Sequence, residues 1–229
     1  MSEPTEGDLV HQTRCATRAL RCKKEYSKYA LTIELLMPFR GHGTPGGQTI
    51  GFFPQLMLTW NPEKHGDRRS TVPDLGVGIY CDYFPFILLR GGFEVKDAFP
   101  EMMTGLPEIK TVGDDPTLKA DYHVVYDQAE DQVKCAIKNK LLPNDEPVFW
   151  FISWGPYFLK VKFGPFTKPQ LDTRASKEND SADWRTKNDI ELRTMDYTRP
   201  LYRIGTRKAA NVIKQFLRDT EHFTTRVPA

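Results

Sequence analysis

The chain has 229 residues and a mass of 26.3 kDa, which fits one large domain or two small ones. Hydrophobic residues make up 39% and charged residues 27% of the chain, close to the globular average, so a collagen-like or wholly disordered chain is excluded. The 32 basic and 30 acidic residues leave a net charge of +2, which excludes a histone-like polycation but not a local basic groove.

Cysteine spacing and the start of the chain indicate the compartment. No pair among the four cysteines has the spacing of a zinc knuckle or redox motif, and four are too few for a disulfide framework, which favours a reducing compartment. The five histidines show no metal-ligand spacing either. The first eight residues contain acids and no apolar run, unlike a secretory signal, and no apolar stretch reaches the roughly 20 residues of a membrane span. We therefore expect a soluble intracellular protein, nuclear or cytoplasmic, without a membrane partner.

The N-terminal part predicts a disordered lead over residues 1–8 and a helix over residues 9–30, where apolar residues recur near helical spacing. The opposite face of this helix is basic. It is either a solvated face or a face that contacts nucleic-acid phosphates. In the second case the contacting residues would be Arg14, Arg18, Arg21 and Lys24.

Three strands are predicted next, after a glycine-rich turn over residues 38–51. Their ranges are 50–60, 71–81 and 84–96, each rich in β-branched or aromatic residues. The Gly91-Gly92 pair in the third strand predicts a bulge or a close approach of two backbones.

The second half returns to helix and then to strands. The predicted elements, in order, are an irregular crossing (97–121), a helix (122–142), two strands around a Gly155-Pro156 turn (146–163), a polar loop (164–188), a further strand (190–204) and a last helix capped by Thr206. The pattern predicts one α/β domain over residues 9–229, with the order helix, three strands, helix, strand, and then a C-terminal strand and helix.

Two short motifs fall on neighbouring predicted strands. Asp74 follows Pro73 at the start of the second strand, and Glu94-Val95-Lys96 closes the third. Residues two apart on a strand point to the same face, so Glu94 and Lys96 share a face while Val95 turns into the core. If the two strands pair as a hairpin, Asp74 returns beside Glu94 and Lys96.

Such a cluster suits a hard divalent cation. Two carboxylates are typical ligands of Mg²⁺, or of Mn²⁺ in the same role, and the Val95 carbonyl could supply a third oxygen. A cation there would polarise a phosphodiester and lower the pKa of a bound water, while Lys96 would orient that water or balance charge on the phosphate. The chain has a second acid-x-Lys triplet, Glu108-Ile109-Lys110, but it lies in the irregular crossing without a strand context.

These motifs resemble those of the PD-(D/E)xK, or restriction-endonuclease-like, nuclease superfamily. The matching residues are Pro73-Asp74 and Glu94-Val95-Lys96, and the order of predicted elements matches the common core of that superfamily. The stretches 127–133, 147–152 and 155–158 further resemble uncharacterised fungal members. The resemblance covers about residues 10–165, which implies a restriction-endonuclease-like core there and a C-terminal extension over 166–229.

The resemblance also implies residue roles. Asp74 and Glu94 match the metal ligands and Lys96 the catalytic lysine, and Gln128 or Gln132 could match a glutamine that some members place near the site. Some members add an acidic ligand from the first helix, a role that Glu34 fits poorly because its secondary structure is undetermined from the sequence.

Simpler interpretations stand beside these. Asp74 could be an ordinary turn acid, and Glu94 with Lys96 an exposed strand pair that contributes less than ~1 kcal/mol. Gln128 and Gln132 fit plain solvated helix positions. The aromatic residues of the last strands favour core packing over stacking on nucleic-acid bases; they are Trp150, Trp154 and Tyr157.

The sequence therefore predicts a magnesium- or manganese-dependent phosphodiesterase, specifically an endonuclease, that acts on DNA, with RNA as a second substrate class. The alternative is a catalytically inactive nucleic-acid or protein-binding module on the same fold, and a third hypothesis is an interaction domain with an aromatic surface. The complete Asp, Glu and Lys set favours catalysis, whereas the near-neutral charge favours the binding module. The oligomeric state stays open, a dimer included.

Overall fold

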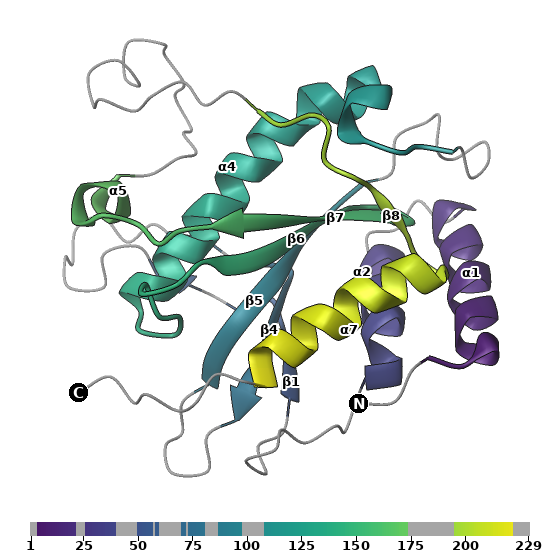
Figure 1. Ribbon diagram of the computed structural model, residues 1–229, viewed down its shortest axis with the longest axis horizontal. Coiled ribbons are helices and arrows are strands. Elements are labelled where there is room, and N and C mark those ends of the chain that lie inside the picture. Colours follow the sequence, from purple (N-terminus) through teal and green to yellow (C-terminus); the bar gives the residue numbers. More distant parts are fainter. Residues whose placement is uncertain are drawn as a thin grey trace.

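A mixed sheet with helices on both faces forms the centre of the molecule (Figure 1). The computed structural model describes residues 4–21, 26–39, 50–56, 58–59, 70–71, 73–80, 87–97, 108–173 and 195–221. The strands of the main sheet are β1 (Ile50–Pro54), β4 (Leu75–Tyr80), β5 (Ile87–Lys96), β6 (Val148–Trp154), β7 (Tyr157–Phe163) and β8 (Tyr202–Arg203). They are ordered β1-β4-β5-β6-β7-β8, and a second sheet pairs β2 (Leu58–Thr59) with β3 (Ser70–Thr71). The predicted α/β class is confirmed.

The strand directions follow from the connections. β1, β4 and β5 pair antiparallel, β6 runs parallel to β5, and β7 and β8 pair antiparallel beyond it. A parallel pair cannot be joined by a tight turn and needs a long crossover. Helix α4 (Pro116–Lys138) lies in the crossover from β5 to β6.

Both faces of the sheet are buried. Along β6, Trp150, Ile152 and Trp154 pack into one apolar cluster with residues of α4. The alternate residue Phe151 packs into a second cluster with α1 (Glu6–Arg21), α2 (Tyr26–Leu36) and α7 (Arg207–Glu221). Successive side chains of a strand point to opposite faces, so a strand covered on both sides reads as a continuous apolar run.

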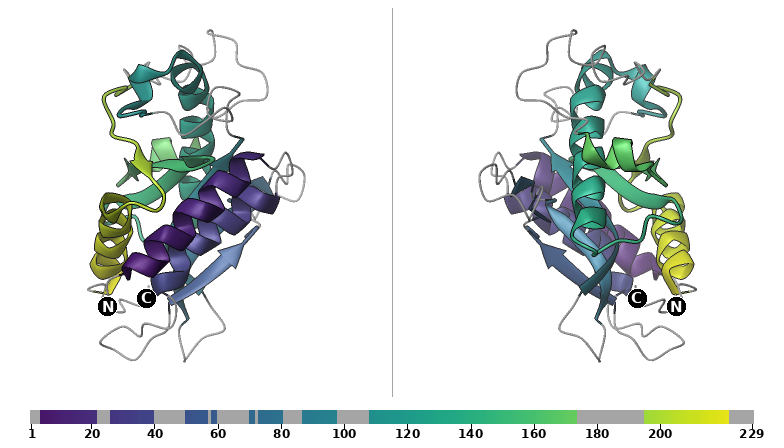
Figure 2. Two further views of the ribbon diagram at one scale, coloured as in Figure 1. Left: turned by 90° about the vertical axis from the view of Figure 1, so that its right-hand side faces the viewer. Right: turned by 90° about the vertical axis from the view of Figure 1, so that its left-hand side faces the viewer.

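The N-terminal segment differs from its prediction. The predicted single helix over 9–30 is wrong, and so is the predicted lead from Glu6 onward, because the chain forms α1 from Glu6 and then α2. A short 3-10 turn, η1 (Met37–Phe39), follows, and residues 1–3 lie outside the described part of the chain. The two helices lie alongside each other (Figure 2). Gln12 of α1 donates from Nε2 to the carbonyl oxygen of Glu34 in α2 at 3.0 Å. In one continuous helix Leu31 would lie about 22 Å beyond Ala16, whereas in the structure both pack into the same cluster.

Helix α4 begins at Pro116 rather than at 122, so the last part of the predicted irregular crossing is helical. Asp115 caps it by accepting from the amides of Thr117 and Leu118 at 2.8 and 2.9 Å, and proline suits the first helical position. The helix ends at Lys138, short of the predicted 142. A 3-10 turn, η2 (Val112–Asp114), precedes it.

Two predicted strands are shorter than expected. β1 ends at Pro54 on the sheet edge, where a proline is tolerated, and Gln55 then adopts a φ of 50°. Of the described residues in the rest of the predicted 50–60 strand, Leu58 and Thr59 form β2, in the other sheet. The predicted 71–81 strand is divided between β3 and β4, and residues 84–86 lie outside the described part of the chain.

The C-terminal part keeps its predicted order. Of the predicted 190–204 strand the structure has the two residues of β8, and residues 174–194 lie outside the described part. The predicted loop 164–188 contains a short helix, α5 (Lys168–Asp172). Thr206 caps α7 as predicted, since its Oγ1 accepts from the Ala209 amide at 3.2 Å. Among the helices described, none combines the length and apolar character needed to cross a membrane.

Candidate metal centre

The register of β4 and β5 brings Asp74 and Glu94 face to face. Leu75 pairs with Phe93, so one residue further along the same register Asp74 lies opposite Glu94. The Val95 amide donates to Asp74 Oδ2 at 2.6 Å and therefore points toward β4. Asp74 and Glu94 then occupy a non-hydrogen-bonded position, where Cα atoms are about 4.5 Å apart and side chains share a face.

Pro73 bears on the carbonyl of Val95, not on its amide. The register places Pro73 opposite Val95, and proline has no backbone N–H to donate to the neighbouring strand. The Val95 amide itself is satisfied by the Asp74 carboxylate. The N–H and C=O of one strand residue point the same way, so the Val95 carbonyl faces Pro73, which cannot donate to it. An oxygen so placed fits the third ligand position predicted for Val95.

The two oxygens of Glu94 have separate partners. Lys96 Nζ lies 2.8 Å from Oε1, and Gln132 Nε2 donates to Oε2 at 2.6 Å. Gln132 in turn accepts from Trp150 Nε1 at 3.1 Å. Because the indole can only donate, it fixes which end of the Gln132 amide turns toward Glu94.

Charge and burial oppose each other at this site. Glu94 is buried, with a relative exposure of 6%, and burial raises the pKa of its carboxyl. The Lys96 ammonium lowers that pKa and the Asp74 charge raises it again. The side chain of Lys96 is 28% exposed and that of Glu94 is 8% exposed, so the lysine stands nearer to solvent.

The structure brings Gln132 to Glu94, and its interpretation as a solvated helix position is wrong. Gln132 has a relative exposure of 2% and contacts Glu94 directly. Gln128 lies one turn earlier on α4 and is half-buried. Its Oε1 is buried and has no hydrogen-bond partner within the described part of the chain.

Of the predicted basic residues, Arg14 and Arg18 do not join this cluster. Arg14 and Arg18 are exposed on α1, which packs on the sheet face opposite to α4. Arg21 ends α1, and Lys24 lies outside the described residues. Glu34, a poor candidate from the sequence, contacts His11 at 3.1 Å instead of the carboxylate pair.

The aromatic residues pack in the core, as the sequence favoured. Trp150, Trp154 and Tyr157 have relative exposures of at most 1%, which excludes stacking of these rings on a nucleic acid in this conformation. Trp154 Nε1 also donates to Asp121 Oδ2 at 2.8 Å.

Sequence analysis missed two polar groupings. Glu130 and Lys134 of α4 form a buried ion pair at 2.7 Å, which their spacing of one helical turn could have indicated. His11 and Cys15 have the same spacing and meet Glu34. The spacing among the histidines did not reveal this group, because the residues that meet His11 are a cysteine and a glutamate.

Comparisons with protein-family models, with curated proteins and with solved structures found no match to this chain. Its function therefore has to be inferred from the geometry of its own residues.

Proposed function

We propose that the protein is a metal-dependent phosphodiesterase, an endonuclease acting on DNA, with Mg²⁺ or Mn²⁺ held at Asp74 and Glu94. The observation that carries the proposal is the meeting of Asp74, Glu94 and Lys96 at one end of the β4–β5 pair, with Gln132 on Glu94. Isolated acid-x-Lys triplets are common. In the Glu94-Val95-Lys96 triplet, however, Glu94 lies opposite Asp74 on the neighbouring strand and accepts a hydrogen bond from Gln132 of α4.

The order of elements supports a restriction-endonuclease-like core. A first helix, the antiparallel strands β1, β4 and β5, the crossover helix α4 and the parallel strand β6 follow one another along the chain. That is the order which the resemblance to the PD-(D/E)xK superfamily implies. Helix α2 and the C-terminal β8 and α7 would then be additions to it.

The donor set fits a hard cation. Carboxylate and carbonyl oxygens from Asp74, Glu94 and Val95 are the ligand types that Mg²⁺ prefers, and Mg²⁺ keeps several waters besides. When bound, the cation supplies polarisation of the phosphodiester and a bound water of lowered pKa. The Val95 amide orients Asp74, and Gln132 orients Glu94.

The role of Lys96 differs between a catalytic protein and a protein that only binds nucleic acid. Without a cation its ammonium balances the charge of Glu94 at 2.8 Å. Once a cation balances that charge, Lys96 can turn toward a phosphate, because its side chain is partly exposed. There it would orient the attacking water and balance the charge that develops on the phosphate oxygens.

One observation favours the alternative, a binding module that lacks turnover. Both oxygens of Glu94 already have partners in Lys96 and Gln132, a set of contacts that holds together without any metal. The small net charge of +2 also lacks the strong basic bias of many nucleases.

Substituting Lys96→Ala tests the proposal. The full chain is incubated with supercoiled plasmid and with single-stranded RNA, in Mg²⁺ or Mn²⁺. We expect wild-type cleavage of the plasmid and a fall of about 10²–10³ in rate for Lys96→Ala, the usual effect of losing a positioned electrostatic group. Lys110→Ala is the matched control, because Lys110 belongs to the chain's other acid-x-Lys triplet and pairs with Glu108 at 3.6 Å on the surface.

Equal activity of Lys96→Ala and Lys110→Ala would contradict the proposed role of Lys96. If the wild type cleaves neither DNA nor RNA but binds DNA in a mobility-shift assay, the binding module replaces the enzyme. Preferential cleavage of RNA would keep the chemistry and overturn the choice of DNA.

A further inference from the structure

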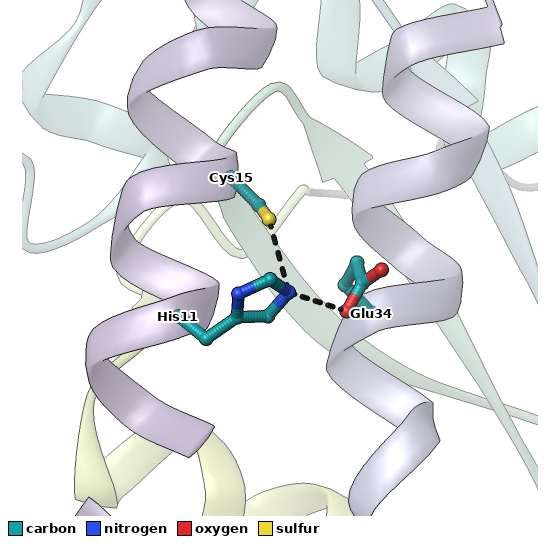
Figure 3. Close-up of side chains that lie close together, drawn as sticks. All are labelled: His11, Cys15 and Glu34. Carbon is teal, nitrogen blue, oxygen red and sulfur yellow. Dashed lines mark hydrogen bonds and ion pairs between the residues drawn. The ribbon is translucent and has the colours of Figure 1, made fainter. Parts of the chain in front are cut away.

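Three side chains of the metal-binding type meet on the surface of the α1–α2 pair (Figure 3). His11 Nε2 lies 3.1 Å from Glu34 Oε2 and 3.5 Å from Cys15 Sγ. The three ligand atoms all lie within 4.8 Å of one another. Figure 3 shows the imidazole between the thiol and the carboxylate, with both dashed lines ending on one nitrogen.

The two helices hold this group in place. His11 and Cys15 are one turn apart on α1 and so share a face, while Glu34 comes from α2. Buried Gln12, next to His11, donates from Nε2 to the carbonyls of Glu34 and Leu35 at 3.0 and 3.4 Å. That side chain fixes the backbone of the third ligand relative to the helix that carries the first two.

The spacing fits a small tetrahedral cation. With Zn²⁺ bonds of about 2.0 Å to nitrogen and oxygen and about 2.3 Å to sulfur, tetrahedral angles put nitrogen about 3.3 Å from oxygen and about 3.5 Å from sulfur. The distances from His11 Nε2 are 3.1 Å to Glu34 and 3.5 Å to Cys15. The nitrogen–oxygen and nitrogen–sulfur distances are thus close to those of a filled site. Rotation of the Glu34 carboxylate can adjust the third distance, between its oxygen and the Cys15 sulfur.

A catalytic triad does not explain the same group. In a nucleophile, base and orienting-acid arrangement, the histidine contacts the nucleophile with one ring nitrogen and the acid with the other. Here Cys15 and Glu34 both approach Nε2. Convergence of a thiol and a carboxylate on one nitrogen suits a shared metal ion and not a relay of protons through the ring.

We propose that His11, Cys15 and Glu34 form a binding site for a borderline divalent transition-metal ion of the Zn²⁺ type, which clips α1 to α2. Thiolate and imidazole select such an ion over Mg²⁺, and three protein ligands leave a fourth position for water. The His11 side chain is 60% exposed and the Glu34 side chain 36% exposed, so that position opens to solvent. The site is separate from the Asp74–Glu94 pair and does not depend on the proposed nuclease function.

Release of a proton on metal binding would be a second sign of this site. Burial, with the Glu34 charge, raises the pKa of the Cys15 thiol, and Arg18 on the next turn of α1 acts in the opposite direction. Binding forms the metal–sulfur bond and releases the thiol proton to solvent. His11 must also be neutral to bind. Affinity should therefore rise with pH, with proton release on titration.

Titration of the full-length chain with Co²⁺, a spectroscopic probe for Zn²⁺ sites, tests the proposal. We expect a thiolate-to-cobalt charge-transfer band that saturates at one equivalent of Co²⁺ per chain, and that Zn²⁺ abolishes and millimolar Mg²⁺ does not. Loss of a group that merely hydrogen-bonds to a ligand weakens metal sites by about 10–100-fold, so removing a ligand itself by Cys15→Ser or His11→Ala should weaken binding by at least about 100-fold. Circular dichroism checks that each variant is folded.

Two control variants separate this site from other metal-binding groups. Cys22→Ser removes another thiol of the same chain, and Asp74→Asn removes a ligand of the proposed magnesium site; both should keep the band and the affinity. Absence of the band in the wild type would overturn the proposal, as would an unchanged band in Cys15→Ser or its loss in Cys22→Ser. Because the band does not depend on nuclease activity, failure of either proposal leaves the other open to test.

Discussion

At Glu94 the requirements of metal binding and of folding conflict. The carboxyl has to be charged to hold a cation, but burial favours its neutral form and raises its pKa above the ordinary value of 4.5. Without metal the folded state then binds more protons than the unfolded state as pH rises from about 4.5 to the raised value. The free energy of unfolding contributed by this group falls over that range and levels off above it.

Glu94→Gln should remove this pH dependence. In metal-free buffer, we expect the variant to gain stability relative to the wild type as pH rises from 4 toward neutrality, because the amide carries no charge to bury. Urea unfolding at a series of pH values measures the difference. Glu108→Gln, at an exposed carboxyl, should show no comparable trend. A constant difference between Glu94→Gln and the wild type at every pH would contradict the raised pKa.

At the scale of single elements, much of the candidate site could be predicted because its signals are local. Pro73-Asp74 and Glu94-x-Lys96 lie on adjacent strands, and the two-residue period of a strand places Glu94 and Lys96 on one face. The contact of Gln132 with Glu94 could not be predicted in the same way. It spans 38 positions in the sequence and depends on how α4 crosses the sheet.

Helix boundaries, too, could be predicted only where a local sequence signal marks them. The start of α4 was predicted at residue 122, although Asp115-Pro116, a capping residue followed by a proline suited to the first turn, could have indicated the true start. The division between α1 and α2 has no such signal, since residues 22–25 contain neither glycine nor proline. It follows from tertiary packing, because both helices bury apolar side chains in the same cluster on the sheet.

The strand β5 depends on its two glycines, and Gly91→Ala tests this. β5 bulges at Arg90, where Val77 pairs with Gly91 and Gly78 with Leu89, as Gly91-Gly92 predicted. A Cβ at Gly91 would clash with the Phe149 backbone oxygen and lie 2.8 Å from Phe216 Cζ. Because backbone cannot yield as a side chain does, we expect a loss of about 1–3 kcal/mol in unfolding free energy by urea titration.

Gly7→Ala is the matched control for that experiment. Gly7 lies in α1, where an added Cβ would meet its nearest neighbour at an ordinary 3.6 Å. Alanine in a helix should be neutral or stabilise by up to about 1 kcal/mol. A Gly91→Ala variant as stable as the wild type would show that the close approach of β5 and β6 is not required.

At the scale of the whole molecule, both faces of the sheet carry an apolar cluster, but successive residues of β5 place a carboxylate on one face and an aromatic ring on the other. Glu94 faces Gln132 on the α4 side, whereas Phe93 stacks on Phe151 with ring centroids 4.7 Å apart on the other side. Phe216 of α7 completes this second face, with its ring centroid 4.9 Å from that of Phe151. The stability that comes from the packing around Phe151 and the metal binding proposed at Glu94 should therefore be separable.

Phe216→Ala and Asp74→Asn test this separation. Phe216 is 1% exposed, so its truncation should lower the unfolding free energy by about 3–5 kcal/mol through lost burial and a cavity. The added stability that millimolar Mg²⁺ gives by binding the folded state should remain, because distant sites act additively. Asp74→Asn should do the reverse, with small loss of stability and no gain from Mg²⁺. Urea titrations with and without Mg²⁺ measure both effects.

Different outcomes contradict the proposed metal centre and the proposed independence of the two faces of the sheet. A wild type whose unfolding is indifferent to Mg²⁺ and Mn²⁺ excludes the metal centre at Asp74 and Glu94, whatever Phe216→Ala does. If Phe216→Ala does not fold, Phe216→Leu keeps the test possible, because it leaves most of the apolar volume in place. If the Phe216 variant folds but loses its Mg²⁺ response, the two faces are coupled, and Glu94 depends on the packing of Phe93 beneath it.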